Sequence, residues 1–277
     1  MNQTATKTIE KELMGRTAIV TGGSFGIGRA TAIRLAQAGA KVAIMSRSRE
    51  RLDESERLIK EVTAPENVIS LICDTCQEDQ VVGAFSKVLE TYGQFDIVVS
   101  NAGSMQNAMI EDCSLKLWEE MYAVLARGYF LVARQAFRHW KGQKLKGSLV
   151  FVVSKNAVTA SPGASAYSSA KAAELHLARC LAEEGGLFGI RVNSVLPDGV
   201  IRGTNILPPG EREKSAARHG VKTEELEDYF SKRNALKCSI TVEDVAEAIL
   251  FFSSDRSAKM TGAVLNVDGG VISAYMR

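Results

Sequence analysis

Short apolar runs alternate with amphipathic segments along most of the chain. The runs predict strands over 17–21, 41–46, 67–72, 95–100, 148–154, 190–196 and 263–268. Apolar positions with helical spacing predict helices over 26–38, 49–62, 78–91, 115–140, 165–184, 224–234 and 242–253. The strands are almost continuous in Val, Ile and Leu, as burial of both sheet faces requires. We therefore expect one doubly wound α/β domain, a parallel sheet with helices on both faces.

The alternation is interrupted after the strand at 190–196. The segment from Gly199 to about Thr223 is polar and contains Pro208-Pro209-Gly210. Long connections at the carboxyl ends of strands often cover ligands, so we expect a substrate lid over about 199–236. Residues 1–13 have no apolar signal-peptide region and are expected to form a flexible leader before a domain over 14–277.

Composition excludes several other classes of protein. The 277 residues carry a net charge of only +2, with basic and acidic residues interleaved, which argues against a nucleic-acid partner. No apolar run is long enough to span a bilayer, so no membrane partner is expected. Five cysteines without an export signal favour a reduced, cytoplasmic setting.

No metal site is expected. Cys73 and Cys76 form a C-x-x-C motif, but it lacks a second pair of ligands and follows a strand, so idle thiols are the favoured interpretation. The three histidines, His139, His176 and His219, are far apart and form no zinc-binding motif.

A glycine-rich turn, TGGSFGIG over 21–28, lies between the first strand and the first helix. Glycines there permit close approach of a pyrophosphate to the backbone, and the helix N-terminus supplies free N–H groups. In this strand–turn–helix context, dinucleotide binding is favoured over a plain turn. The candidate contacts are Gly22, Ser24, Phe25, Gly26, Ile27 and Gly28.

The stretch SKNAVTASPGASAYSSAK places Tyr167 and Lys171 four residues apart on one helix face, with Ser154 upstream at a strand end. A phenol with a pKa of about 10 is a poor base at neutral pH, and a nearby ammonium favours its ionised form. We therefore expect Lys171 to lower the pKa of Tyr167. The alternative is a surface tyrosine that happens to lie beside a lysine.

These motifs together resemble the short-chain dehydrogenase/reductase family over about residues 14–270. The family's N-A-G motif matches Asn101, Ala102 and Gly103, and its closing strand matches residues 266–270. The resemblance implies a Rossmann-like fold, a homotetramer, and Asp74, Thr75 and Val200 as further cofactor contacts. It also implies Tyr167 as the acid/base, Lys171 on the nicotinamide ribose, and Ser154 on the substrate oxygen.

A narrower similarity concerns the segments VVSKNA, AYSSAKAAELHLARCLAEEGG, GIRVN and SDRSAKMTG. They resemble the dehydrogenase half of rhamnulose-phosphate aldolase/dehydrogenase fusion proteins, which implies sugar, polyol or hydroxyaldehyde substrates. No aldolase half is present in this sequence. Lys155, Asn156 and Arg202 lie on strand-end loops, where they either bind substrate hydroxyl or anionic groups or are solvated.

Two positions depart from the family pattern. Leu125 stands where the family's active-site asparagine is usual, and a leucine cannot hydrogen-bond to the water chain that feeds the lysine. Proton exchange must then use another route. Pro197-Asp198-Gly199 stands where Pro-Gly is usual, which changes the loop under the nicotinamide.

The end of the second strand indicates which nicotinamide cofactor is preferred. NAD-binding members usually carry a carboxylate near Ser46, and none is present here. Ser46 can donate to a 2′-phosphate and Arg47 can pair with it, so NADP is favoured, with NAD possible if Arg47 only stacks on adenine.

The sequence thus predicts an NAD(P)-dependent oxidoreductase acting on a small alcohol or carbonyl compound. Two alternatives are open: a 3-oxoacyl-carrier-protein-type ketoreductase, and a non-catalytic dinucleotide-binding regulator. Leu125 favours the regulator, whereas the intact set of Ser154, Tyr167 and Lys171 argues against it.

Overall fold

Seven parallel strands form one sheet in the order β3-β2-β1-β4-β5-β6-β7. The structure, a computed structural model, describes residues 11–207 and 210–274. The strands are β1 (Thr17–Thr21), β2 (Lys41–Ser46), β3 (Val68–Ile72), β4 (Ile97–Ser100), β5 (Gly147–Val152), β6 (Ile190–Pro197) and β7 (Val264–Val267). The predicted doubly wound fold is confirmed.

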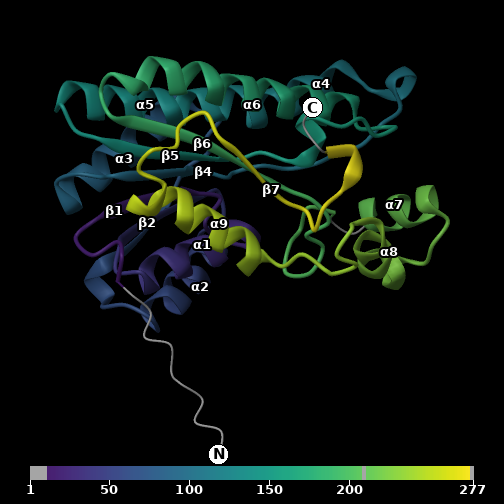
Figure 1. Cartoon of the computed structure of the whole chain (residues 1–277), viewed down its shortest axis with the longest axis horizontal. Helices are drawn as coiled ribbons and strands as arrows, with labels where there is room; N and C mark the ends of the chain where they lie inside the picture. Colours follow the sequence, from purple (N-terminus) through teal and green to yellow (C-terminus); the bar gives the residue numbers. More distant parts are fainter. Residues whose placement is uncertain (1–10, 208–209, 275–277) are drawn as a thin grey trace, which may run out of the picture.

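Helices cover both faces of this sheet (Figure 1). One face carries α3 (Glu78–Tyr92), α5 (Gly128–Gly142) and α6 (Ser165–Gly186), and the other carries α1 (Gly26–Gln37), α2 (Arg49–Lys60) and α9 (Val242–Ser253). The connections α4 (Leu115–Tyr122), α7 (Glu211–His219) and α8 (Leu226–Arg233) lie beyond the carboxyl ends of the strands.

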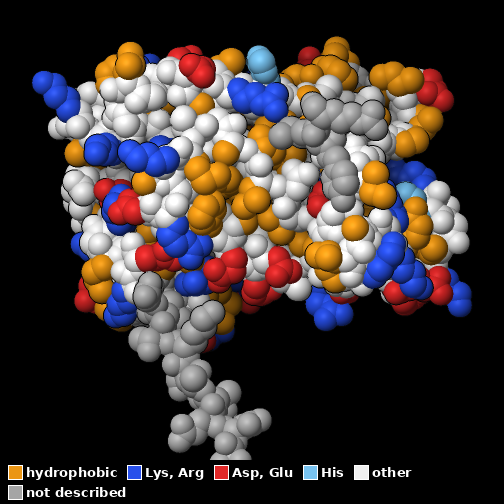
Figure 2. Space-filling view, in the orientation of Figure 1, with side chains coloured by type: hydrophobic (Ala, Val, Ile, Leu, Met, Phe, Trp, Pro, Cys, Tyr) orange, Lys and Arg blue, Asp and Glu red, His pale blue; other side chains and the backbone are white. Residues whose placement is uncertain are grey.

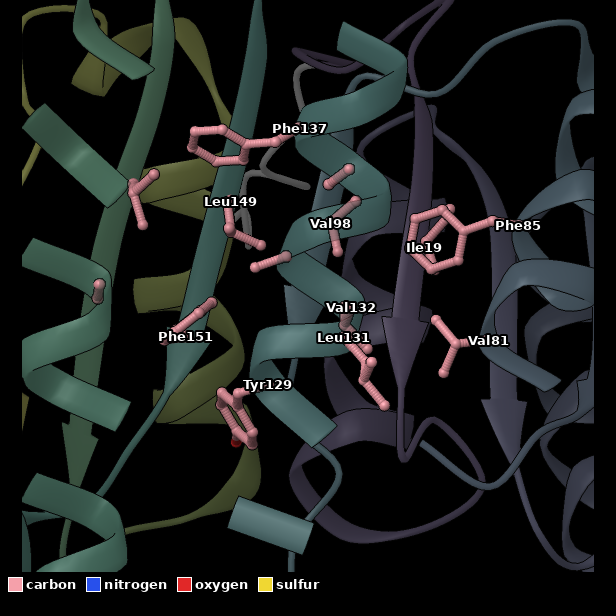
Figure 3. Packing of buried hydrophobic residues seen from close by; sticks show 14 of the residues in the cluster. Ile19, Val81, Phe85, Val98, Tyr129, Leu131, Val132, Phe137, Leu149 and Phe151 are labelled. Atoms are coloured by element: carbon pink, nitrogen blue, oxygen red, sulfur yellow. The ribbon is translucent and has the colours of Figure 1, made fainter. Parts of the chain in front are cut away.

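Successive strand residues face opposite layers, which explains why the strands are apolar throughout. Ile19 and Val98 belong to the same buried cluster as Leu131 and Val132 of α5, and all four are labelled in Figure 3. Their neighbours in sequence, such as Val20, pack into the layer of α1 and α9. Both layers are fully buried, so the sheet holds the strand ends in fixed positions.

Two predicted segments are organised differently in the structure. The helix expected over 115–140 is divided by a π-helical turn at Ala123–Arg127. The segment predicted to form a lid contains α7, which sequence periodicity did not predict because seven of its nine residues are polar or charged. Residues 208–209 of that segment lie outside the described residues.

The packed part of the domain includes Leu13, one residue before the predicted start at residue 14. Residues 1–10 of the predicted leader lie outside the described residues, but Leu13 is 1% exposed and its N–H donates to the Ala38 carbonyl at 2.9 Å. Lys and Arg side chains lie among Asp and Glu on the face shown in Figure 2 and form no single basic patch there. Throughout the described ranges, no helix combines the length and apolar character needed to cross a membrane.

Candidate active site

A cavity of about 860 Å³ opens at the carboxyl ends of the strands, where the strand order reverses between β1 and β4. Ligands of doubly wound folds bind at this switch point. The predicted residues that line the cavity are Gly22, Ser24, Phe25, Gly26, Ile27, Ser46, Arg47, Asp74, Thr75, Asn101, Ala102, Gly103, Ser154, Tyr167, Lys171 and Val200. Gly28 does not line it and lies beneath the turn.

The glycine-rich turn is tied to the end of β4. The Asn101 side-chain amide donates to the Thr21 carbonyl at 2.9 Å, and the Thr21 hydroxyl accepts the N–H groups of Asn101 and Ala102 at 2.9 and 3.1 Å. Gly22 has φ of 65°, a conformation that glycine adopts without strain. The glycine and these hydrogen bonds together hold the turn in one conformation.

The space under this turn fits only a glycine at position 28. A Cβ on Gly28 would lie 2.2 Å from the Gly22 carbonyl oxygen and 2.5 Å from Nδ2 of Asn101. Phe25, at the N-cap of α1, makes no side-chain capping hydrogen bond, so the first N–H groups of the helix face the cavity without a side-chain acceptor. This is the arrangement that a dinucleotide pyrophosphate requires.

Cationic side chains mark the end of the cavity beside β2. The Ser24 hydroxyl donates to the Ser46 hydroxyl at 2.7 Å, which fixes Ser46 at the cavity wall. Arg47 and Arg51 line the same region, and the Arg51 guanidinium stacks 5.6 Å from the Phe25 ring centroid. The sequence analysis did not name Arg51 as a cofactor contact. Arg51 lies four residues after Arg47, in the first turn of α2.

Ser154, Tyr167 and Lys171 meet at the opposite side of the cavity. Ser154 follows β5, and its hydroxyl accepts the Asn156 N–H at 3.2 Å. Tyr167 and Lys171 lie on α6 at 5% and 4% exposure, and the Lys171 Nζ is 6.0 Å from the Tyr167 ring centroid. The three side chains predicted to act together are therefore brought together.

Glu174 is a further charged residue of this site that the sequence analysis missed. Its side chain is fully buried one helical turn after Lys171, and its Oε2 accepts a hydrogen bond from Lys171 Nζ at 2.9 Å. Lys171 also donates to the Val152 carbonyl at 3.1 Å. The i, i+3 spacing from Lys171 was the available signal, because it places the carboxylate on the same helix face.

Burial, and not Lys171, controls the protonation of Tyr167. Burial raises the pKa of the Tyr167 hydroxyl above its usual value of 10, a hydrogen bond with Ser154 opposes this, and the charges of Glu174 and Asp198 raise it further. The expected lowering of the Tyr167 pKa was thus wrong for this structure. The physical reason is that burial disfavours the charged phenolate, and the nearby carboxylates of Glu174 and Asp198 disfavour it further.

The Lys171–Glu174 pair is itself perturbed by its surroundings. Burial raises the pKa of Glu174 to about 8, against the opposing effect of Lys171, and burial lowers the pKa of Lys171. Both shifts favour the neutral form of each side chain. Moving a proton from Lys171 to Glu174 therefore costs less free energy than it would in a solvent-exposed lysine–glutamate pair.

Comparisons with known proteins agree with this geometry. The family model described as enoyl-(acyl carrier protein) reductase matches residues 22–272. A solved short-chain type dehydrogenase/reductase from Mycobacterium marinum is 30% identical, with a TM-score of 0.84 over 95% of this chain and 97% of that one. The chain belongs to the short-chain dehydrogenase/reductase family.

Two curated relatives add to this assignment. An uncharacterized oxidoreductase, YuxG, from Bacillus subtilis is 45% identical over 97% of this chain. The chain spans only 39% of the length of that relative. A glucose 1-dehydrogenase from Gluconobacter oxydans is 30% identical over 93% of this chain and 92% of its own length.

The position of the usual short-chain dehydrogenase/reductase asparagine is apolar in the structure as well. Leu125 lies in the π-helical turn, is fully buried and does not line the cavity. A Cβ on Gly103 would lie 3.3 Å from a Leu125 methyl group and 4.0 Å from Lys171 Nζ. Leu125 therefore closes the region beside Lys171 that an asparagine would leave polar, and Glu174 supplies a polar contact from the other side.

The substrate end of this short-chain dehydrogenase/reductase cavity contains Lys155 and Asn156 but not Arg202. Lys155 is 4% exposed and pairs with Asp198, with Nζ 3.3 Å from Oδ2. Arg202 instead pairs with Glu227, at 3.2 Å between Nη2 and Oε1. Of the two alternatives for Arg202, the structure favours the solvated one, because its side chain is 79% exposed and lies outside the cavity.

The cysteine motif has no reactive character in this structure. Burial raises the pKa of Cys73 to about 12 and that of Cys76 to about 11, with the Asp74 charge adding to both shifts. Thiolate is scarce at neutral pH under these conditions, which agrees with idle thiols.

Proposed function

We propose that this chain is an NAD(P)-dependent oxidoreductase that transfers a hydride between nicotinamide and a small alcohol or carbonyl compound. A sugar, polyol or hydroxyaldehyde is the favoured substrate class. The observation that carries the proposal is that Ser154, Tyr167 and Lys171 share one cavity with a glycine-rich turn. The glucose 1-dehydrogenase relative supports the sugar or polyol class.

Each side chain has a defined role in this proposal. A bound nicotinamide supplies or accepts the hydride. Tyr167 gives its proton to the substrate oxygen during carbonyl reduction, and Ser154 donates a hydrogen bond to that oxygen as charge develops. Lys171, held by Glu174 and the Val152 carbonyl, positions the nicotinamide ribose. Because burial raises the pKa of Tyr167, the phenol carries its proton at neutral pH, and this is the proton that carbonyl reduction uses.

The cofactor is proposed to be NADP, with NAD as the weaker alternative. Ser46, Arg47 and Arg51 surround the position expected for the ribose 2′-phosphate, and no carboxylate among the cavity-lining residues lies on β2 or at the start of α2. Guanidinium groups pair with phosphate oxygens in bidentate geometry.

Other expectations remain predictions. The homotetramer and the cytoplasmic location belong to the proposal, as does the similarity to rhamnulose-phosphate aldolase/dehydrogenase fusion proteins. The matched family model, described as an enoyl-(acyl carrier protein) reductase, keeps an acyl-carrier ketoreductase as the second candidate. A non-catalytic regulator is disfavoured because all three reactive side chains face the cavity.

The test is a nicotinamide absorbance assay with NADPH or NADP+ and a panel of aldoses, polyols, lactaldehyde and an acetoacetyl thioester. We expect turnover of a hydroxyaldehyde, sugar or polyol that is lost in Tyr167→Phe, while this variant still binds the cofactor. Turnover of the thioester alone would favour the ketoreductase. Cofactor binding without turnover of any compound would refute the proposal.

A further inference from the structure

The lid side of the cavity gathers cationic side chains from three separate segments. Lys155 follows β5, Arg218 lies in the last turn of α7 and Arg233 ends α8, and all three line the cavity together with His219. Burial lowers the pKa of His219, and the charges of Arg233, Arg218 and Lys155 each lower it further. The three cations are therefore close to one imidazole ring.

Aromatic contacts hold two of these groups in place. His219 stacks on Tyr229 with ring centroids 4.5 Å apart, so α7 and α8 meet at this point. The Arg233 guanidinium carbon lies 5.6 Å from the Tyr229 centroid and 5.5 Å from the Phe230 centroid. Guanidinium stacking on rings keeps the N–H edge available for an acceptor.

Arg218 faces the segment that leads into the catalytic helix. Its Nη1 lies 3.4 Å from where a Cβ on Gly163 would stand, two residues before α6 begins. Tyr167 is in the first turn of that helix, and both residues line the same cavity. One bound molecule that reacts at Tyr167 can therefore extend to Arg218 within this cavity.

The acidic groups nearby do not balance these cations. Asp198 pairs with Lys155 at 3.3 Å, and its charge also interacts with that of Arg233, so one carboxylate faces more than one cation. Within the described ranges, neither Arg218 nor Arg233 forms a salt bridge, whereas Arg202 on the same lid is paired with Glu227. Both guanidinium groups are exposed at the cavity wall, where a bound anion can reach them.

We infer that Arg218 and Arg233, with Lys155 beside them, bind an oxyanion group of the substrate, a phosphate monoester or a carboxylate. The inference rests on the proposed function and narrows its substrate to an anionic hydroxy or carbonyl compound. Guanidinium groups match the geometry of both groups.

The binding experiment does not depend on turnover. Inorganic phosphate and, separately, acetate are titrated calorimetrically into protein saturated with NADP+, so that the cofactor phosphate positions are filled. Sodium chloride at matched ionic strength controls for screening. The variants are Arg218→Met and Arg233→Met, and Arg202→Gln is the matched control on the same lid.

We expect one of the two anions to bind, with affinity reduced about tenfold or more in each of the two Met variants and unchanged in the control. Tighter binding of phosphate or of acetate identifies the phosphate ester or the carboxylate. Absence of saturable binding of both, or equal binding by the variants, overturns the inference.

Turnover then separates this inference from the proposed function. Dihydroxyacetone and fructose are compared with dihydroxyacetone phosphate, fructose 6-phosphate and gluconate. Higher kcat/KM for an anionic compound, lost mainly through KM in Arg218→Met, supports the subsite. Equal use of neutral and anionic compounds overturns it and leaves the oxidoreductase standing. Anion binding without any turnover supports the subsite and refutes the oxidoreductase.

Discussion

Replacing Gly28 with alanine tests the claim that the turn after β1 is shaped for a pyrophosphate. The new Cβ would lie 2.2 Å from the Gly22 carbonyl oxygen, whereas an ordinary carbon–oxygen contact is about 3.3 Å. The turn must therefore move by about 1 Å relative to α1. Overpacking of this kind costs about 1–3 kcal/mol of folding stability.

The displacement also moves N–H groups away from the phosphate oxygens. A hydrogen bond to a charged group contributes about 1.5–3 kcal/mol, so losing one raises the Kd for NADP+ by about tenfold or more. Calorimetric titration of the cofactor measures this change, and thermal unfolding measures the stability loss. Unchanged cofactor affinity in a folded Gly28→Ala protein would refute the proposed role of the turn.

Gly83→Ala is the matched control. Gly83 lies inside α3, and a Cβ there would meet nothing within 4 Å. Alanine is a better helix former than glycine by up to about 1 kcal/mol, so this variant should unfold at a slightly higher temperature and bind NADP+ normally. A loss of cofactor affinity in the control would show that the assay reports general damage to the fold.

Three further predictions concern the cavity. Ser46→Asp should lower the ratio of kcat/KM for NADPH over NADH by about tenfold or more, because a carboxylate repels the 2′-phosphate; an unchanged ratio counts against the NADP assignment. Ser154→Ala should reduce kcat by about 10²-fold in steady-state assays, and full activity would show that catalysis does not need the hydrogen bond assigned to Ser154. Glu174→Gln removes a charge that raises the pKa of Tyr167, so the pH at which alcohol oxidation becomes fast should fall; an unmoved pH profile would contradict this coupling.

The strands and the main site residues were predictable because their local patterns are strong. The run KVAIMS became β2 with the expected bounds, and the turn at 21–28 occupies the expected strand–helix junction. Helix α7 was not predictable in the same way, since EREKSAARH has few apolar residues and is held by contacts such as the stacking of His219 on Tyr229.

The electrostatics of the site were the hardest part to predict. Glu174 follows Lys171 in a helix that looks amphipathic, and a glutamate in that setting is usually solvated. Its burial arises from packing of α6 against the rest of the domain, which no local pattern encodes. The pKa of Tyr167 depends on that burial, so its direction could not be obtained from the sequence alone.

The hydrogen bonds of Asn101 have a consequence for how quickly and how tightly a dinucleotide is captured. They hold Thr21 and the following turn in shape through contacts within the protein itself. The turn has thus already lost, during folding, the conformational entropy that it would otherwise lose when a dinucleotide binds. Such preorganisation means that most of the interaction energy with a phosphate is available as affinity.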